Sequence, residues 1–556
     1  MRIAVYFYFN ISEKVATMYV EEIKNKQGKK VYRTVLIRES YKEKGKVKHR
    51  TIANISRLPA SQIAQIKAVL YGEKVFLSEE EFKTSNSREY GASAAFLDIG
   101  KRLGLNKLLY SRQEQWRDDL MAMIVGRIVF QGSKLHLSNL FMDSALWELC
   151  GHPYGVKINV NKHCYLPLDK LLERQESIQK ELAKRHLQDG CLILYDMTNT
   201  WLEGEYADSK LVDRGLGKGG KKGYKQIAIG LIADKRGCPV AIEVFTGHTS
   251  DQTTVKEQAE RLASVYGVRE IIFAGDRGML TPKRIDEVTE YGFKTLTALT
   301  HPQIFKLLER DVIQPELFDE HRIEEVRDPD NPQIRYMLCK NPSTMRRERE
   351  TRDSLVEKVN LELGKIAKVK KKRSKEKVCA RIGALLGRYK IGKFYNWNVS
   401  DTGTVEWSLD SAFIERERLF DGCYIVRTDV ESMSAAEAVA GYKSLAGVER
   451  AFRNLKTVSL EIRPIYHKKD DRIRAHVFIC MLAYYIQWHA TECLAPLFES
   501  DRNNADSRWS FQIVMERLKS IRKENLKIKG IEAGSKITTP DVEQQIILDL
   551  LGVKIG

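Results

Sequence analysis

The feature that most limits the fold of this chain is a run of apolar segments between residues 191 and 299. "CLILYDMTNT", "KQIAIGLIAD" and "CPVAIEVFTG" are rich in aliphatic residues and follow one another closely, as strands joined by short connections do. A helical segment, "DQTTVKEQAERLASVYG", comes next, and then the strand "REIIFAGDRG", a short helix over 282–290 and the strand "GFKTLTALT". The pattern predicts three strands in a meander, followed by helix, strand, helix and strand.

This order of elements restricts how the strands can pair. Parallel strands need a crossover of a dozen or more residues, and the two predicted helices supply such crossovers. We therefore expect a mixed sheet with an antiparallel hairpin on one side, in which the first and fourth strands lie side by side. The order is that of a ribonuclease H-like fold, and we predict an α/β protein with that core.

The remaining sequence is long enough for several further parts, since the chain has 556 residues. Residues 345–377 predict one long charged helix, and "KFYNWNVSDTGTVEWSLD" alternates like a pair of strands. We predict a division into an N-terminal basic hairpin module, a helical module, the first part of the core, a large insertion, the second part of the core and a mainly helical C-terminal tail. Their bounds are 1–92, 93–188, 189–310, 311–419, 420–500 and 501–556.

Charge and cysteine usage restrict the environment and the partner. The formal net charge of +18 calls for a polyanionic partner, commonly nucleic acid and more rarely an anionic membrane surface. The nine cysteines are scattered without a C-x-x-C pair, which argues against a zinc module or a disulfide framework and fits a reducing cytoplasm. The longest apolar stretch, over 475–488, is too short to span a bilayer. We expect a cytoplasmic protein that binds a polyanion.

Two of the predicted strands end alike, each on an aspartate. "LILYD" ends on Asp196 and "IIFAGD" ends on Asp276. Ligand sites in such sheets lie beyond the carboxyl ends of the strands. Two carboxylates there would repel each other unless a cation lay between them, and Mg²⁺ or Mn²⁺ is the hard cation that oxygen ligands select. The alternative is that each aspartate caps a turn.

A third acidic residue comes from the predicted helix "GYKSLAGVERAFRNLK", over 441–456. Positions seven apart return to nearly the same face of a helix, so Tyr442, Glu449 and Lys456 share one stripe, with Arg453 beside it. Glu449 can complete a metal site and Lys456 can hold a phosphate, whereas the alternative is a surface helix with a Glu449–Arg453 ion pair. The apolar side predicted to dock on the sheet comprises Val448, Phe452 and Leu455.

These residues resemble a family signature. The chain resembles the DDE transposases of bacterial insertion sequences, and is similar to the branch with a Y-x2-R-x3-E-x6-K signature. Tyr442, Glu449 and Lys456 match it, while Leu445 stands at the arginine position. Family-like segments also include "GHTSDQTT", "FDGCYIVRTD" and "RPIYHKKDDRIRAHVFICMLAY". The resemblance covers roughly residues 30–550.

The resemblance implies phosphoryl transfer on DNA, by hydrolysis and transesterification, with two Mg²⁺ or Mn²⁺ ions in each active site. One ion would activate a water or a 3′-hydroxyl, and the other would stabilise the leaving oxygen. Asp196, Asp276 and Glu449 would be both the catalytic residues and the metal ligands. Asp196 would bridge both ions, and the other two carboxylates would each bind one.

The resemblance also implies contacts with DNA phosphates. Lys456 and Tyr442 would contact the backbone beside the scissile bond. Leu445 removes one expected phosphate contact, which Arg450 or Arg453 could replace. A solvated lysine and a packed tyrosine are the plain structural alternatives for the first two.

The activity implied is that of a transposase that binds the terminal inverted repeats of its element, cuts the ends and joins them to target DNA. Its partners would be double-stranded DNA, at the transposon ends and the target, and a second copy of the chain in a homodimer that bridges two ends. We expect no membrane partner, and a place in the bacterial cytoplasm at the nucleoid. Two alternatives stay open: a ribonuclease H-like nuclease without strand transfer, and a catalytically inactive, transposon-derived DNA-binding protein.

Overall fold

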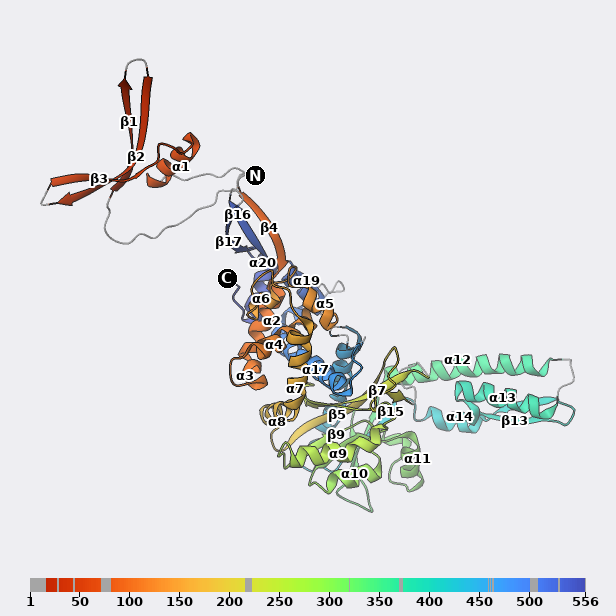
Figure 1. Ribbon diagram of the computed structural model, residues 1–556. Helices are drawn as coiled ribbons and strands as arrows, with labels where there is room; N and C mark the ends of the chain where they lie inside the picture. The colour runs from red at the N-terminus through yellow and green to blue at the C-terminus, as the bar shows by residue number, and fades with distance from the viewer. Residues whose placement is uncertain are drawn as a thin grey trace. The chain divides into compact units, whose positions relative to one another are not determined.

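The computed structural model describes most of the chain, which divides into two compact units (Figure 1). The first unit comprises Met1–Arg88 and Arg522–Thr539, and the second comprises Glu89–Ile521 and Pro540–Gly556. The residues described are 17–27, 30–43, 46–71, 82–215, 223–319, 321–369, 374–458, 460, 462, 465–500, 509–528 and 531–555.

The first unit contains the predicted basic hairpin. Strand β2 (Lys30–Glu43) pairs with β3 (Lys46–Asn54), and β1 (Thr17–Gln27) pairs with the other edge of β2. Helix α1 (Ala60–Leu70) packs against this three-stranded antiparallel sheet. The small core between them consists of Val20, Val35, Ile55 and Ile63.

A second small sheet in this unit differs from the prediction for the C-terminal tail. Strands β16 (Arg522–Ile528) and β17 (Ile531–Ile537) form a hairpin that pairs with β4 (Phe82–Glu89). The buried Arg88 guanidinium donates to Asn525 Oδ1 at 2.9 Å across β4 and β16. The tail therefore contains a β-hairpin as well as α19 (Phe511–Lys519) and α20 (Val542–Leu551). These strands are short and polar, so they lack the apolar periodicity that marks a strand in sequence.

In the second unit, helices form a layer around α17 (Asp470–Cys493), which contains the apolar stretch 475–488. It packs against several helices and against strand β8. Among the described residues, no helix is long and apolar enough to cross a membrane. The other members of this helical layer are α2 (Gly91–Arg102), α3 (Leu105–Leu109), α4 (Gln115–Val129), α5 (Lys134–Asn139), α6 (Leu146–Leu149), the π-helix η1 (Asn161–Tyr165), α7 (Leu166–Glu173) and α8 (Gln175–His186).

The central sheet confirms the predicted strand order. Its core strands run in the order β8-β7-β5-β9-β10, antiparallel on the β8 side of β5 and parallel on the other. The bounds are β5 (Cys191–Trp201), β7 (Lys225–Asp234), β8 (Pro239–Thr246), β9 (Ile271–Ala274) and β10 (Lys294–Ala298), with the two-residue β6 (Asp213–Arg214) beside β7. The crossovers are α9 (Asp251–Ser264) and α10 (Pro282–Thr289). This is the ribonuclease H-like arrangement.

The sheet continues beyond the core into the segment predicted as an insertion. Strand β15 (Cys423–Thr428) pairs with β10, and β12 (Arg335–Lys340) and β11 (Glu324–Arg327) follow, all antiparallel. The sequence suggested that residues 311–419 lie outside the sheet. That prediction is wrong for β11 and β12, which belong to it. Helix α11 (His301–Glu309) and the 3₁₀ turn η2 (Pro315–Leu317) precede β11 in the chain.

The rest of this segment has a hydrophobic core of its own. The predicted single charged helix is two helices, α12 (Pro342–Ala367) and α13 (Lys375–Tyr389). The predicted strand pair is confirmed as β13 (Tyr395–Val399) and β14 (Val405–Leu409). The core that joins these elements includes Val359, Leu363, Ile382, Leu386 and Phe394. The remaining elements are η3 (Gly392–Phe394) and α14 (Ser411–Arg418).

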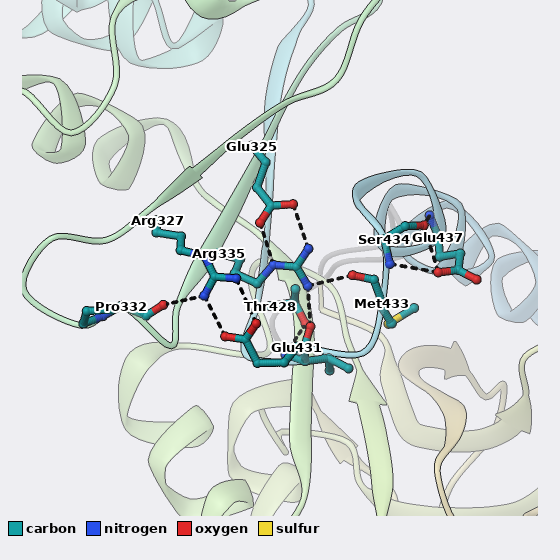
Figure 2. A network of polar contacts seen from close by, with 10 residues as sticks. Glu325, Arg327, Pro332, Arg335, Thr428, Glu431, Met433, Ser434 and Glu437 are labelled. Carbon is teal, nitrogen blue, oxygen red and sulfur yellow. Dashed lines mark hydrogen bonds and ion pairs between the residues drawn. The ribbon is translucent and has the colours of Figure 1, made fainter.

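A buried arginine ties the edge of the sheet to the loop after β15 (Figure 2). The Arg335 side chain on β12 is buried and forms a two-pronged ion pair with Glu325 on β11, at 2.8 and 2.7 Å. Its other nitrogen donates to the carbonyl oxygens of Val430 and Met433, at 2.5 and 2.7 Å. One guanidinium therefore holds the loop that leads into helix α15 (Ala435–Lys443).

Neighbouring contacts reinforce the same loop (Figure 2). Arg327 pairs with Glu431 through both oxygens, at 2.7 and 2.8 Å. Ser434 and Glu437 form a capping box at the start of α15, in which each side chain satisfies the other's backbone N–H. The position of α15 therefore follows from the extended sheet edge as well as from packing on the core.

We predict that Arg335→Gln lowers the free energy of unfolding by about 2–3 kcal/mol, because Glu325 and two loop carbonyls lose a buried charged partner. Arg322→Gln is the matched control, since Arg322 pairs with Glu324 at 3.4 Å and has a side chain 77% exposed; it should change stability by no more than about 0.5 kcal/mol. Chemical denaturation of the two variants measures the difference. Equal effects would contradict a structural role for the Arg335 contacts.

Candidate active site

Asp196 lies within strand β5, not at its end as predicted. The strand continues to Trp201, paired with β7 along this length, whereas its pairing with β9 reaches only as far as Leu194 and Ala274. The apolar run stops at Asp196 because β9 stops there, and the residues that follow need no longer be apolar. Asp196 thus occupies the point where β5 passes the carboxyl end of its parallel neighbour.

Asp276 lies at the same end of the neighbouring strand. It follows Ala274 by two residues, just as Asp196 follows Leu194, and Leu194 and Ala274 are partners in the parallel ladder. Asp276 is exposed, and its side chain accepts a hydrogen bond from the Arg277 N–H at 2.8 Å. This bond reaches the N–H of the next residue, whereas a turn-capping aspartate bonds to the N–H two residues on.

The alternation of β5 decides what Asp196 faces. The Tyr195 hydroxyl donates to Thr254 in α9 at 2.8 Å, so odd-numbered residues of the strand point to that helix. A Cβ built on Gly441 of α15 would lie 3.1 Å from Leu192, so even-numbered residues point to the opposite side. Asp196 and Thr198 share that side, which α16 (Leu445–Arg453) also covers.

The segment that carries Glu449 is not the single helix predicted from its sequence. Helix α15 ends at Lys443, α16 begins at Leu445, and the π-helix η4 (Asn454–Val458) follows. The stripe formed by Tyr442, Glu449 and Lys456, which are spaced seven residues apart, is therefore interrupted twice: between α15 and α16, and between α16 and η4. The docking face is as predicted: Val448, Phe452 and Leu455 are buried, while Glu449 is exposed.

Two glycines allow α16 to lie close to the turn between β7 and β8. A Cβ on Gly447 would lie 3.4 Å from the Gly237 Cα, and a Cβ on Gly237 would lie 3.3 Å from the Gly447 Cα. Gly237 also has a φ of +84°, a conformation that favours glycine. The helix that carries Glu449 therefore meets this turn backbone to backbone, which fixes how near it lies to the sheet.

The surroundings of Asp196 combine burial with negative charge. Burial, together with the charges of Asp276, Asp251 and Glu449, raises the pKa of Asp196 to about 7. A hydrogen bond from the Met197 N–H at 2.7 Å acts in the opposite direction. The four carboxyl groups thus share one electrostatic environment at the edge of the sheet.

The three carboxylates have the chemistry that a hard divalent cation requires, although their oxygen atoms lie apart from one another. Asp196, Asp276 and Glu449, all described residues, do not form a group whose ligand atoms lie within 4.8 Å of one another. They offer oxygen donors and a negative potential, which are what Mg²⁺ or Mn²⁺ requires. Like charges repel, and an added positive charge between them would favour closer approach.

Tyr442 and Lys456 both make contacts at or beside the two aspartates. The Tyr442 hydroxyl donates to Asp276 Oδ1 at 3.5 Å, and burial raises the pKa of Tyr442 to about 12, so the phenol stays protonated. The Lys456 ammonium donates to the Thr198 hydroxyl, two residues beyond Asp196. Arg450 and Arg453 of α16 are both exposed.

Sequence reasoning missed Thr198 and the influence of Asp251. Thr198 lies two residues after Asp196, so the period of a strand would have placed both on one face had the strand been extended past the aspartate. Asp251 is the first residue of α9. Its effect on Asp196 could not be read from the chain, because it depends on how α9 packs against the sheet.

We predict that Gly447→Val lowers stability by about 1–3 kcal/mol, because the larger side chain must displace the backbone of the β7–β8 turn. Gly383→Val is the control, since a Cβ at Gly383 of α13 meets no atom within 4 Å. Thermal unfolding of both variants gives the comparison. The same loss in both would mean that helix propensity, and not the close approach, determines the effect.

A second prediction concerns the pH dependence of stability without divalent ions. The pKa of Asp196 is higher in the folded chain than in the unfolded chain, so protonation of this residue stabilises the fold. The stabilisation is complete below the unfolded pKa of 3.8 and is lost as pH rises through about 7. The Asp196→Asn variant cannot ionise at this position. The difference between its free energy of unfolding and that of the unsubstituted chain should therefore shift in favour of the variant by up to about 3 kcal/mol from about pH 5 to pH 8. Denaturant unfolding in the presence of a chelator measures the difference. A difference that does not change with pH would contradict the raised pKa.

Comparison with known proteins identifies two matching family models. The family model described as "Transposase DDE domain" matches residues 140–486, and "IS1634 family transposase, N-terminal domain" matches residues 20–85. A solved structure of a piggyBac transposase synaptic complex with hairpin DNA is similar at 8% identity and a TM-score of 0.35, over 77% of this chain and 76% of that chain. Comparison with curated proteins gave no match.

The first family match covers more than half of the chain. It includes all three acidic residues: Asp196 in β5, Asp276 just after β9, and Glu449 in α16. The second match covers the three-stranded sheet of the first unit. The chain belongs to the DDE transposases of insertion sequences.

Proposed function

We propose that this protein binds the terminal inverted repeats of its element and catalyses DNA strand cleavage and strand transfer at a site formed by Asp196, Asp276 and Glu449. The observation that carries the proposal is the register of β5 and β9, in which both aspartates follow partnered residues by two positions. Helix α16, with Glu449, packs against β5, and Lys456, just after this helix, contacts Thr198 on the side that Asp196 faces.

Two Mg²⁺ or Mn²⁺ ions are the cofactors that fit these donors. Asp196, Asp276 and Glu449 would hold these ions through their carboxylate oxygens. When bound, such ions supply an activated oxygen nucleophile and stabilise the leaving oxygen. Burial and the neighbouring negative charges make ionisation of Asp196 unfavourable in the absence of a cation. This supports cation binding at that position.

The residues around the trio have roles of their own in this proposal. Lys456, held over β5 by Thr198, neutralises a phosphate beside the scissile bond. Tyr442 donates a hydrogen bond towards Asp276 and limits its rotation. Arg450 and Arg453 contact the DNA backbone from the exposed side of α16, in place of the arginine that Leu445 replaces.

In this proposal the first unit binds the DNA ends, and the net positive charge of the chain attracts the DNA backbone. Lys46, Lys48 and Arg50 are exposed along β3, where a strand can lie against a phosphate backbone. A homodimer that bridges two ends, acting on the bacterial nucleoid, completes the proposal. The second candidate function, a nuclease that cuts without joining, uses the same acidic trio and differs in the product it releases.

We predict that Asp196→Asn, Asp276→Asn and Glu449→Gln each lower the rate of strand cleavage by at least about 10³-fold while end binding persists, because each removes a metal ligand but no DNA-binding surface. A magnesium assay with a labelled transposon end measures cleavage, and a gel-shift assay in the absence of magnesium measures binding. Asp251→Asn is the matched control, since Asp251 also acts electrostatically on Asp196; it should retain activity.

Normal cleavage by any one of the three variants would remove that residue from the site. Loss of activity in Asp251→Asn equal to theirs would show that general charge, and not ligation, matters. Addition of an unlabelled target duplex separates the two candidate functions, because joined product supports a transposase and cleavage alone supports a nuclease.

A further inference from the structure

Three potential metal ligands converge in the second unit, away from the acidic trio in sequence. His186 at the end of α8, Cys238 just before β8 and His489 in α17 bring one ligand atom each within 4.8 Å of one another. We propose that Cys238, His186 and His489 bind a structural Zn²⁺ ion. Thiolate and imidazole are the ligands that zinc selects, and they differ from the oxygen donors that magnesium requires.

One histidine nitrogen of the three clustered residues is buried without a hydrogen-bond partner. His489 Nε2 is inaccessible to solvent and has no partner, although burying an unsatisfied polar nitrogen is costly. Its ring packs edge-on against Tyr485 and Trp488, with centroids 4.7 and 4.9 Å apart, so its orientation is held by aromatic neighbours. A metal ion beside Nε2 accounts for a nitrogen that the protein itself leaves unpaired.

The other two ligands are also enclosed. Cys238 is fully buried. His186 turns Nε2 towards the Tyr485 hydroxyl at 3.0 Å, while its Nδ1 lies 3.9 Å from Asp234 Oδ2, beyond hydrogen-bond range. Three protein ligands leave one coordination position, for water or for Asp234. The Asp234 carboxylate also adds negative charge beside a dication.

A thiolate and two neutral imidazoles are the forms that bind zinc, so occupation of the site would displace the proton of the Cys238 thiol.

A second cluster does not support the same inference. Asp119, His152 and His163 also lie close together, but Asp119 Oδ1 pairs with His152 Nε2 at 2.6 Å and Oδ2 pairs with His163 Nδ1 at 2.9 Å. These contacts already satisfy both carboxylate oxygens. The first cluster is therefore the one whose chemistry is incomplete without an ion.

The location of the proposed zinc site gives it a structural role. Cys238 directly follows Gly237, which meets Gly447 of α16 backbone to backbone. The turn before Cys238 is closed by Asp234, whose Oδ1 accepts from the N–H groups of Arg236 and Cys238 at 2.8 and 2.9 Å. Zinc would link this turn to α8 and α17, and so hold the surface on which the Glu449 helix rests.

The test measures zinc bound by the full-length chain in the presence of excess Mg²⁺. We expect about one equivalent of zinc per chain, retained by Asp196→Asn and lost by Cys238→Ser and His489→Phe, with affinity lowered by more than about 100-fold. The phenylalanine keeps the aromatic packing against Tyr485 and Trp488 but removes the ligand. Cys480→Ser, a buried cysteine of α17 in neither cluster, is the control for loss of a thiol.

Cobalt substitution gives a readout that does not depend on the variants folding equally well. Co²⁺ added to the zinc-free chain should give the visible bands of tetrahedral coordination and a thiolate charge-transfer band. Zinc bound equally by the chain and by Cys238→Ser, or cobalt bound without the thiolate band, would overturn the proposal. Because these measurements need no DNA, their failure would leave the proposed transposase activity untouched.

Discussion

The parallel pairing of β5 with β9 is the interaction on which the candidate active site depends. It places Asp196 and Asp276 at the same level, since the pairing stops two residues before each of them. The antiparallel pairing of β5 with β7 continues past this point, so Asp196 stays in an ordered strand while its other edge opens. A ladder that ends on one side and continues on the other creates both the position and the partial burial of this carboxyl group.

The third acidic residue depends on contacts that lie outside the core sheet. Arg335 holds the loop before α15 through two carbonyl oxygens, and the Gly237–Gly447 approach sets the distance of α16 from the sheet. The strands β11 and β12, which belong to the large segment between the core's two parts, thus take part in placing Glu449. The proposed zinc site would act on the same turn from the opposite direction.

Much of the fold could be predicted because its core strands are continuous apolar runs with helices of sufficient length between them. The strands β11, β16 and β17 could not, since they are short, polar or charged segments at sheet edges. Such strands are stabilised by pairing with neighbours that are distant in the chain, and their own residues show no periodicity. The break at Ser444 was missed for a related reason, because helical periodicity continues across it in the sequence.

The sequence by itself determined the order of the core strands, the aspartates that follow their apolar runs, and the signature residues Tyr442, Glu449 and Lys456. The tertiary structure alone decided the shared electrostatic environment of Asp196 and Asp251, the contact of Lys456 with Thr198, and the convergence of His186, Cys238 and His489. Periodicity reports only what lies along one strand or helix. Contacts between distant segments follow from how those elements pack, which no single stretch of the chain encodes.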